Sequence, residues 1–212
     1  MLRRRRFAER DRGDTLIEVL FAFAVLSLVI IGALTIMNQG AIASQRSLEI
    51  SLVRNEVDAQ ATAIRFLHDA YVAQFKPNTT YDPTTPAGQW AKMSQAIGTI
   101  TSASSFGAVA SCPIPPQGSF IIDPTNATYI AGSSTVLVPA TTTAKVMYDT
   151  NTGLLKQAQG IWIEAVRSPI ATDVNKKNTR YIDFHIYACW DSPGSGPPMT
   201  IGTIVRLYEP QS

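Results

Sequence analysis

The chain's most prominent pattern is an apolar run close to its N-terminus. The 19 residues from Val19 to Met37 carry no charge. In an α-helix, which rises about 1.5 Å per residue, they would cover roughly 28 Å, close to the hydrocarbon thickness of a bilayer. The pattern therefore predicts a membrane-spanning helix, which we place at residues 14–40.

The same helix is predicted to continue beyond the membrane, over residues 41–76. The first 76 residues contain no proline, and all 13 prolines fall between Pro77 and Pro210. Proline breaks a helix interior, so a single helix from Ile17 to Phe75, nearly 90 Å long, is the simplest account. Its second half is amphipathic, because apolar or small residues recur at steps of three to five. The expected buried stripe is Ser44, Leu48, Leu52, Val57, Ala61, Ile64, Leu67, Tyr71 and Phe75.

Residues 77–212 are predicted to form a β-rich globular domain. A proline-rich loop ends the long helix, and a short helix is expected around Gln89 to Ile97. Apolar residues then alternate with polar ones in Tyr181–Trp190, the period of a half-buried strand. The fold class is therefore α+β, with the amphipathic half of the helix covering an antiparallel sheet. The expected strands are 119–122, 135–138, 145–148, 161–167, 181–190 and 203–208.

Charge is concentrated before the apolar run. The whole chain carries +2, but residues 1–13 hold six Arg against two acidic residues, so the remainder is left with a net charge of −2. Basic residues on one side of a span keep that side in the cytoplasm. A conventional secretory signal is the alternative, with Ala41-Ile42-Ala43 as its cleavage site. The acidic remainder disfavours nucleic-acid binding.

Both cysteines, Cys112 and Cys189, lie in the part predicted to be outside the cell. An oxidising compartment favours a disulfide between them, and closing a loop of about 76 residues would stabilise the fold by a few kcal/mol. Two buried free thiols are the alternative, since unpaired Cys is often buried.

One string at the start of the apolar run is more specific than a membrane anchor requires: Gly13-Asp14-Thr15-Leu16-Ile17-Glu18-Val19-Leu20. It resembles the processing site of type IV prepilins and the related pseudopilins, in which a basic leader ends in Gly before an apolar helix that carries an early Glu. The resemblance implies that prepilin peptidase removes residues 1–13 between Gly13 and Asp14. It also implies N-methylation of Asp14, where the family most often has Phe, and an assembly role for Glu18.

The resemblance further implies a pilin-like fold and a structural role. The chain would be a major or minor subunit of a type IV pilus, stored as a single-pass membrane protein and then polymerised outside the cell. Its partners would be other pilins and the assembly platform with its ATPase. Such filaments serve adhesion and twitching motility. A pseudopilin of a secretion or DNA-uptake machine is one alternative, and a membrane-anchored enzyme or binding domain is another.

The remaining residues suggest no catalysis. His68 and His185 are far apart in the sequence, and no H-E-x-x-H, C-x-x-C or phosphate-binding Gly-rich pattern accompanies them. We therefore expect no enzyme activity, no metal and no cofactor, with both histidines as polar surface residues. Gly32 and Gly40 are either points of bending or close packing, or simply the glycines common in membrane helices. Glu18 in an isolated span would only reach toward the lipid headgroups.

Overall fold

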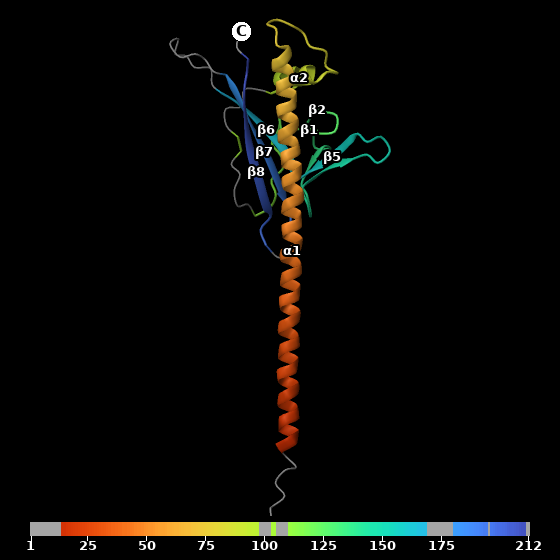
Figure 1. The fold of residues 1–212 in the computed structure, drawn as a ribbon, viewed down its shortest axis with the longest axis vertical. Coiled ribbons are helices and arrows are strands. Elements are labelled where there is room, and N and C mark those ends of the chain that lie inside the picture. Colours follow the sequence, from red (N-terminus) through yellow and green to blue (C-terminus); the bar gives the residue numbers. More distant parts are fainter. Residues whose placement is uncertain (1–13, 98–102, 105–109, 169–179, 195, 211–212) are drawn as a thin grey trace, which may run out of the picture. The chain divides into compact units, whose positions relative to one another are not determined.

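The computed structural model describes residues 14–97, 103–104, 110–168, 180–194 and 196–210. The chain divides into two compact units, one ending at Gln45 and the other beginning at Arg46. Helix α1 (Asp14–Gln74) belongs to both, and the C-terminal unit contains all the other elements (Figure 1).

Helix α1 begins and ends close to the predicted positions. It covers Asp14–Gln74, compared with the expected Ile17–Phe75. After its last residue, Asn78 adopts a positive φ of 57°, next to the proline that cannot extend the helix. The hydroxyl of Tyr81 accepts a hydrogen bond from the Lys76 amide (2.9 Å) and donates one to the Gln74 carbonyl (3.2 Å). Tyr81 therefore satisfies backbone groups that a helix end leaves without partners.

The buried stripe of α1 in the C-terminal unit matches the prediction only in part. Val57 and Ile64 are buried as expected, together with Val53. Leu48 and Leu52, however, are 61% and 49% exposed, so their assignment to the stripe was wrong. The way α1 packs on the sheet therefore decides which of its apolar residues are covered.

Five strands form an antiparallel sheet in the order β2-β1-β6-β7-β8, and α1 lies against this sheet within the C-terminal unit (Figure 1). In β7, Ile182, Phe184 and Ile186 are buried, as the alternation predicts, and they share a core with residues of α1. From Ile186 to Trp190 every residue is buried, because both faces are covered there. The strands are β1 (Phe120–Asp123), β2 (Thr128–Ala131), β6 (Ile161–Arg167), β7 (Tyr181–Trp190) and β8 (Met199–Tyr208).

A second, three-stranded sheet has the order β3-β5-β4. Its strands are β3 (Leu137–Val138), β4 (Lys145–Tyr148) and β5 (Leu155–Gln159). β4 and β5 are antiparallel, whereas β3 and β5 are parallel, which the prediction of a single antiparallel sheet did not include. Two strands, β2 and β5, were also missed. Both are short, and β5 (Leu-Lys-Gln-Ala-Gln) buries only Ala158, so it carries little apolar signal.

The short helix α2 (Pro86–Ala96) starts slightly earlier than predicted. Thr85 is its N-cap and accepts a hydrogen bond from the Gly88 amide at 3.2 Å, while Pro86 occupies the first turn, where a missing N–H costs nothing. Trp90 and Met93 of α2 are buried, and the Trp90 ring meets Phe184 of β7 edge to face at 5.7 Å. α2 therefore closes the core at the end where α1 stops.

Candidate functional site

The N-terminal half of α1 exposes its apolar side chains. Every residue from Thr15 to Gly40 is exposed, including Phe21 at 70% and Leu28 at 74%. The polar side chains of Ser27 and Thr35 donate hydrogen bonds to the carbonyls of Phe23 and Ile31, one turn earlier in the same helix. This helix is long and apolar enough to cross a membrane, and the hydroxyl groups of Ser27 and Thr35 are satisfied within it, as a lipid environment requires.

Glu18 interrupts this surface one turn from the start of the helix. Its side chain is exposed, and its carboxylate has neither a hydrogen bond nor an ion pair within the part of the chain that the structure describes. A charge placed at the edge of hydrocarbon is costly unless it is hydrated or paired. A partner for Glu18 must therefore come from water, from lipid headgroups or from another molecule.

Gly32 and Gly40 lie near Glu18 around the helix. At about 100° per residue, both fall within about 40° of Glu18 in azimuth. A Cβ atom built on either glycine would have nothing within 4 Å. No contact within the described chain therefore requires glycine at these positions.

Two residues assigned to leader processing are not placed in detail. Gly13 and the rest of residues 1–13 lie outside the described residues, as does the side chain of Asp14. The structure shows only that Asp14 is the first helical residue. Cleavage at Gly13 and methylation of Asp14 remain predictions.

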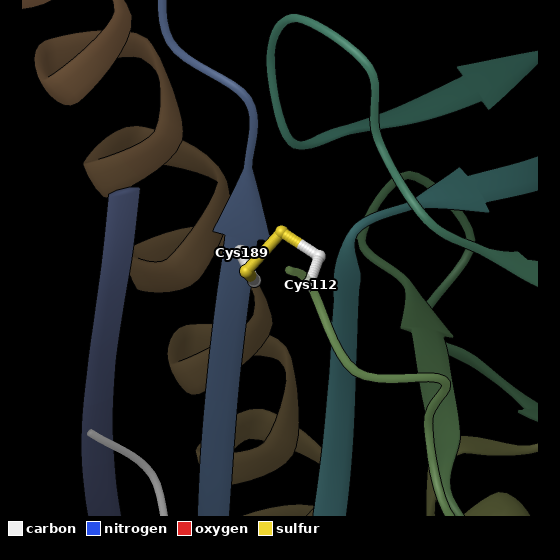
Figure 2. Close-up of a disulfide and its surroundings, with 2 residues drawn as sticks. All are labelled: Cys112 and Cys189. Carbon is white, nitrogen blue, oxygen red and sulfur yellow. A yellow bond between two sulfur atoms is a disulfide. The ribbon is translucent and has the colours of Figure 1, made fainter. Parts of the chain in front are cut away.

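Cys112 and Cys189 form a disulfide (Figure 2). Their sulfur atoms are 2.11 Å apart and their Cα atoms 5.6 Å apart, which excludes the free-thiol alternative. Cys189 is fully buried near the end of β7, and its amide donates to the Gly160 carbonyl at 2.8 Å. The disulfide therefore fastens the segment before β1 to β7 of the five-stranded sheet.

Two charged residues of α1 form hydrogen bonds with the end of β7 and the loop that follows it. The sequence analysis did not predict these contacts. The Glu49 carboxylate accepts hydrogen bonds from Trp190 Nε1 (3.0 Å) and from the Ser192 hydroxyl (3.2 Å). Arg46 Nε donates to the Pro193 carbonyl at 3.2 Å. Both residues belong to α1. Their spacing of three residues places them on one side of the helix, but nothing in the sequence indicates which loop they meet.

His68 and His185 lie on different elements and have different partners. His68 is nearer to the core than expected, with its side chain only 12% exposed and its Nε2 atom 2.9 Å from the Tyr208 carbonyl. His185 Nδ1 lies 3.3 Å from the Tyr187 hydroxyl on the outer side of β7. Among the described residues, no three His, Cys, Asp or Glu side chains are grouped as metal ligands.

Comparison with known proteins adds no relative: no family model, curated protein or solved structure matches this chain.

Proposed function

We propose that this protein is a pilin-like filament subunit, held in the membrane by α1 and assembled through the exposed face that carries Glu18. The observation that carries the proposal is the unpaired Glu18 on an uncovered apolar helix, within the prepilin-like string from Gly13 to Leu20. An anchor that never polymerises needs neither feature.

The physical argument concerns the transfer of α1 from lipid into a filament core. A subunit leaving the bilayer keeps its apolar surface covered only if other helices replace the lipid. Leader removal creates an N-terminal amine, and the amine of one subunit is the natural partner for Glu18 of the next. Pairing neutralises both charges before they enter an apolar interior and sets the axial register of the subunits.

Gly32 and Gly40 support the same assignment. Helices approach closely where Gly or Ala lines the contact. Gly32 and Gly40 have open space around them within this chain, so a neighbouring helix is a physical reason for their presence. The Arg-rich head sets the orientation in this proposal, with the N-terminus in the cytoplasm and the disulfide-bonded unit outside.

The first experiment determines the mature N-terminus by mass spectrometry of the protein from its native membrane. The expected N-terminus is Asp14. An intact Met1, or a start after Ala43, would refute processing of the prepilin type. The same spectrum measures methylation of the Asp14 amine as an added 14 Da or so per methyl group.

The second experiment tests the charge pair with Glu18→Ala. Glu56→Ala is the matched control, because Glu56 lies on the same helix but in the C-terminal unit. Both variants should insert in the membrane, and only Glu18→Ala should fail to enter filaments. Normal incorporation of Glu18→Ala would contradict the charge-pair argument.

A pseudopilin of a secretion or DNA-uptake machine remains the second candidate, because the same processing string and helix would serve it. Shearing cells and probing the released filaments separates the two roles. Enrichment in sheared filaments supports a pilus subunit. Absence from otherwise abundant filaments, with Asp14 as the mature N-terminus, supports the pseudopilin.

A further inference from the structure

A polar cavity of about 260 Å³ lies in the C-terminal unit, where α1, α2 and the sheet end together. It is formed by the last turn of α1, the middle of α2, the end of β6, the start of β7 and the residues after β8. Its lining residues are Tyr71, Phe75, Trp90, Ser94, Arg167, Arg180, Glu209 and Pro210. The cavity is smaller than the roughly 300–1,000 Å³ of sites for drug-sized molecules, so it fits a ligand with one ring.

Arg167 is held in the cavity wall with donor capacity to spare. Its Nη2 donates to the carbonyl (2.5 Å) and the hydroxyl (2.8 Å) of Ser94, and its Nη1 lies 3.4 Å from the Glu209 carboxylate. Its Nε is buried and has no hydrogen-bond partner among the described residues. The Arg167 side chain as a whole is 30% exposed, and its Nη1, with one described contact at 3.4 Å, keeps an N–H group for a ligand oxygen.

Arg180 adds a second cation to the cavity wall. It is exposed and makes no ion pair with any residue that the structure describes. Its backbone is fixed, because its carbonyl accepts the Glu209 amide at 2.9 Å. With two guanidinium groups and one carboxylate, the cavity carries a net charge of about +1 and favours a monoanion.

The rest of the wall suits a hydroxylated ring. Tyr71 and Phe75, which are partly exposed, supply aromatic surfaces for the C–H faces of a ring, and the buried Trp90 lies behind them. Glu209 and Ser94 supply oxygen atoms that accept hydrogen bonds from hydroxyl groups. A purely aromatic acid would leave these oxygen atoms without donors, and a neutral sugar would leave the guanidinium groups without an anion.

We propose that this cavity binds an acidic sugar, a single pyranose ring that carries a carboxylate, as in a uronic acid. The carboxylate meets Arg180 and Arg167, the ring lies against the aromatic side chains, and the hydroxyl groups bond to Glu209 and Ser94. The cavity lies wholly within the C-terminal unit, so this site is independent of how α1 assembles.

The affinity expected for such a ligand is modest. Glucuronate has about 13 non-hydrogen atoms, and at about −0.3 kcal/mol per atom it would bind with a dissociation constant near 1 mM. The test uses the full chain in detergent micelles and measures binding of sodium glucuronate by ligand-observed NMR titration. Glucose and benzoate are titrated in parallel. Glucuronate should bind at least about tenfold more tightly than either, because only glucuronate has both a carboxylate for the guanidinium groups and hydroxyl groups for Glu209 and Ser94.

Arg180→Gln is the decisive variant, since its side chain is exposed and its removal disturbs no described contact of the core. It should weaken glucuronate binding by about tenfold or more and leave glucose unaffected. Arg167→Gln should do the same, although it also removes the bonds to Ser94. The matched control is Arg206→Gln, because Arg206 is ion-paired with Asp183 on the neighbouring strand and does not line the cavity.

A further titration with methyl glucuronoside, whose anomeric carbon is blocked as in a glycan chain, distinguishes two sources of the sugar. Binding equal to that of glucuronate identifies the end of a polysaccharide, and weaker binding identifies the free monosaccharide. The proposal is overturned if glucuronate shows no saturable binding at about 20 mM, roughly 20 times the expected dissociation constant. It is also overturned if glucose or benzoate binds equally well, or if Arg180→Gln binds glucuronate like the unaltered protein.

Discussion

Gln60 provides a sharp test of how α1 is fixed on the sheet. Its side chain is fully buried, its Nε2 donates to the Ile122 carbonyl (2.7 Å), and its Oε1 accepts from the Ile122 amide (2.9 Å). β1 pairs with β6 only at Phe120↔Ile163, so the strand ladder has already ended at Ile122. The helix side chain therefore takes the place of the missing neighbour strand.

Replacing Gln60 by Met keeps the shape of the side chain but removes both hydrogen bonds. The Ile122 amide and carbonyl are then buried without partners, at about 1–3 kcal/mol each, partly offset because the polar Gln amide no longer has to be desolvated. We expect the free energy of unfolding to fall by about 2–4 kcal/mol. In a unit of this size that corresponds to a loss of about 5–15 °C in Tm.

The assay is urea unfolding of the full chain in micelles, followed by tryptophan fluorescence. All three tryptophans lie in the C-terminal unit and are buried there, so their emission reports that unit alone. Gln74→Met, at an exposed position of the same helix, is the control and should change stability by less than about 0.5 kcal/mol. An equally small effect of Gln60→Met would refute the reasoning.

Gln60→Glu adds a pH signature to the same test. A protonated carboxyl group can still donate to the Ile122 carbonyl and accept from its amide, whereas an ionised one repels the carbonyl oxygen. The fold therefore favours the protonated form and raises the pKa of the introduced group. Relative to the unaltered protein, the variant should be nearly as stable below pH about 4.3 and lose stability as pH rises through the folded pKa.

Three further predictions follow from the C-terminal unit. Gly160 and Gly153 both have positive φ, 60° and 67°, but a Cβ at Gly160 would lie 2.1 Å from the Cys189 carbonyl oxygen, whereas one at Gly153 would lie in open space. Gly160→Ala should therefore lower the free energy of unfolding in urea by several kcal/mol and Gly153→Ala by about 1 kcal/mol. Equal losses would contradict this. Removing the disulfide with Cys112→Ser and Cys189→Ser together should lower the free energy of unfolding by about 4–5 kcal/mol in the chain-entropy model, given the separation of 77 residues. An unchanged urea midpoint would show that the disulfide does not stabilise the fold. Burial raises the pKa of four tyrosines, Tyr71, Tyr129, Tyr148 and Tyr187. The unfolded chain therefore loses these protons at a lower pH than the folded chain, so the urea midpoint should stay constant up to pH about 10 and fall above it. A midpoint that stays constant above that pH would count against their burial.

Local signals predicted most of the elements. Proline distribution and 3.6-residue periodicity were enough for α1, and period-two alternation was enough for β7, because both depend on the chain's immediate neighbours. The short strands β2 and β5 were missed for the complementary reason. β5 buries only Ala158, so its conformation depends on pairing with β4 and β3 rather than on its own pattern.

The functional sites likewise include one that the local sequence predicted and one that it did not. The exposed apolar helix and its lone Glu18 are readable from the sequence alone, since no distant residue contributes to them. The cavity beside Arg167 and Arg180 was not predicted, because its walls come from five segments that are far apart in the chain. Arg167 and Arg180 are thirteen positions apart and form no recognisable sequence motif, and only the pairing of β6 with β7 brings them together.

The sequence by itself determined the long helix, the apolar span and its boundary charge, the β-rich C-terminal unit and the two cysteines available for pairing. Each of these follows from composition or spacing over a few consecutive turns or strands. Only the tertiary structure decided which helix residues are covered, which sheet holds each strand, and that Gln60 and Glu49 bond to groups distant in sequence. Those outcomes depend on which partners the buried polar groups meet in the folded chain. Because these partners are distant in sequence, no short stretch of the sequence predicts them.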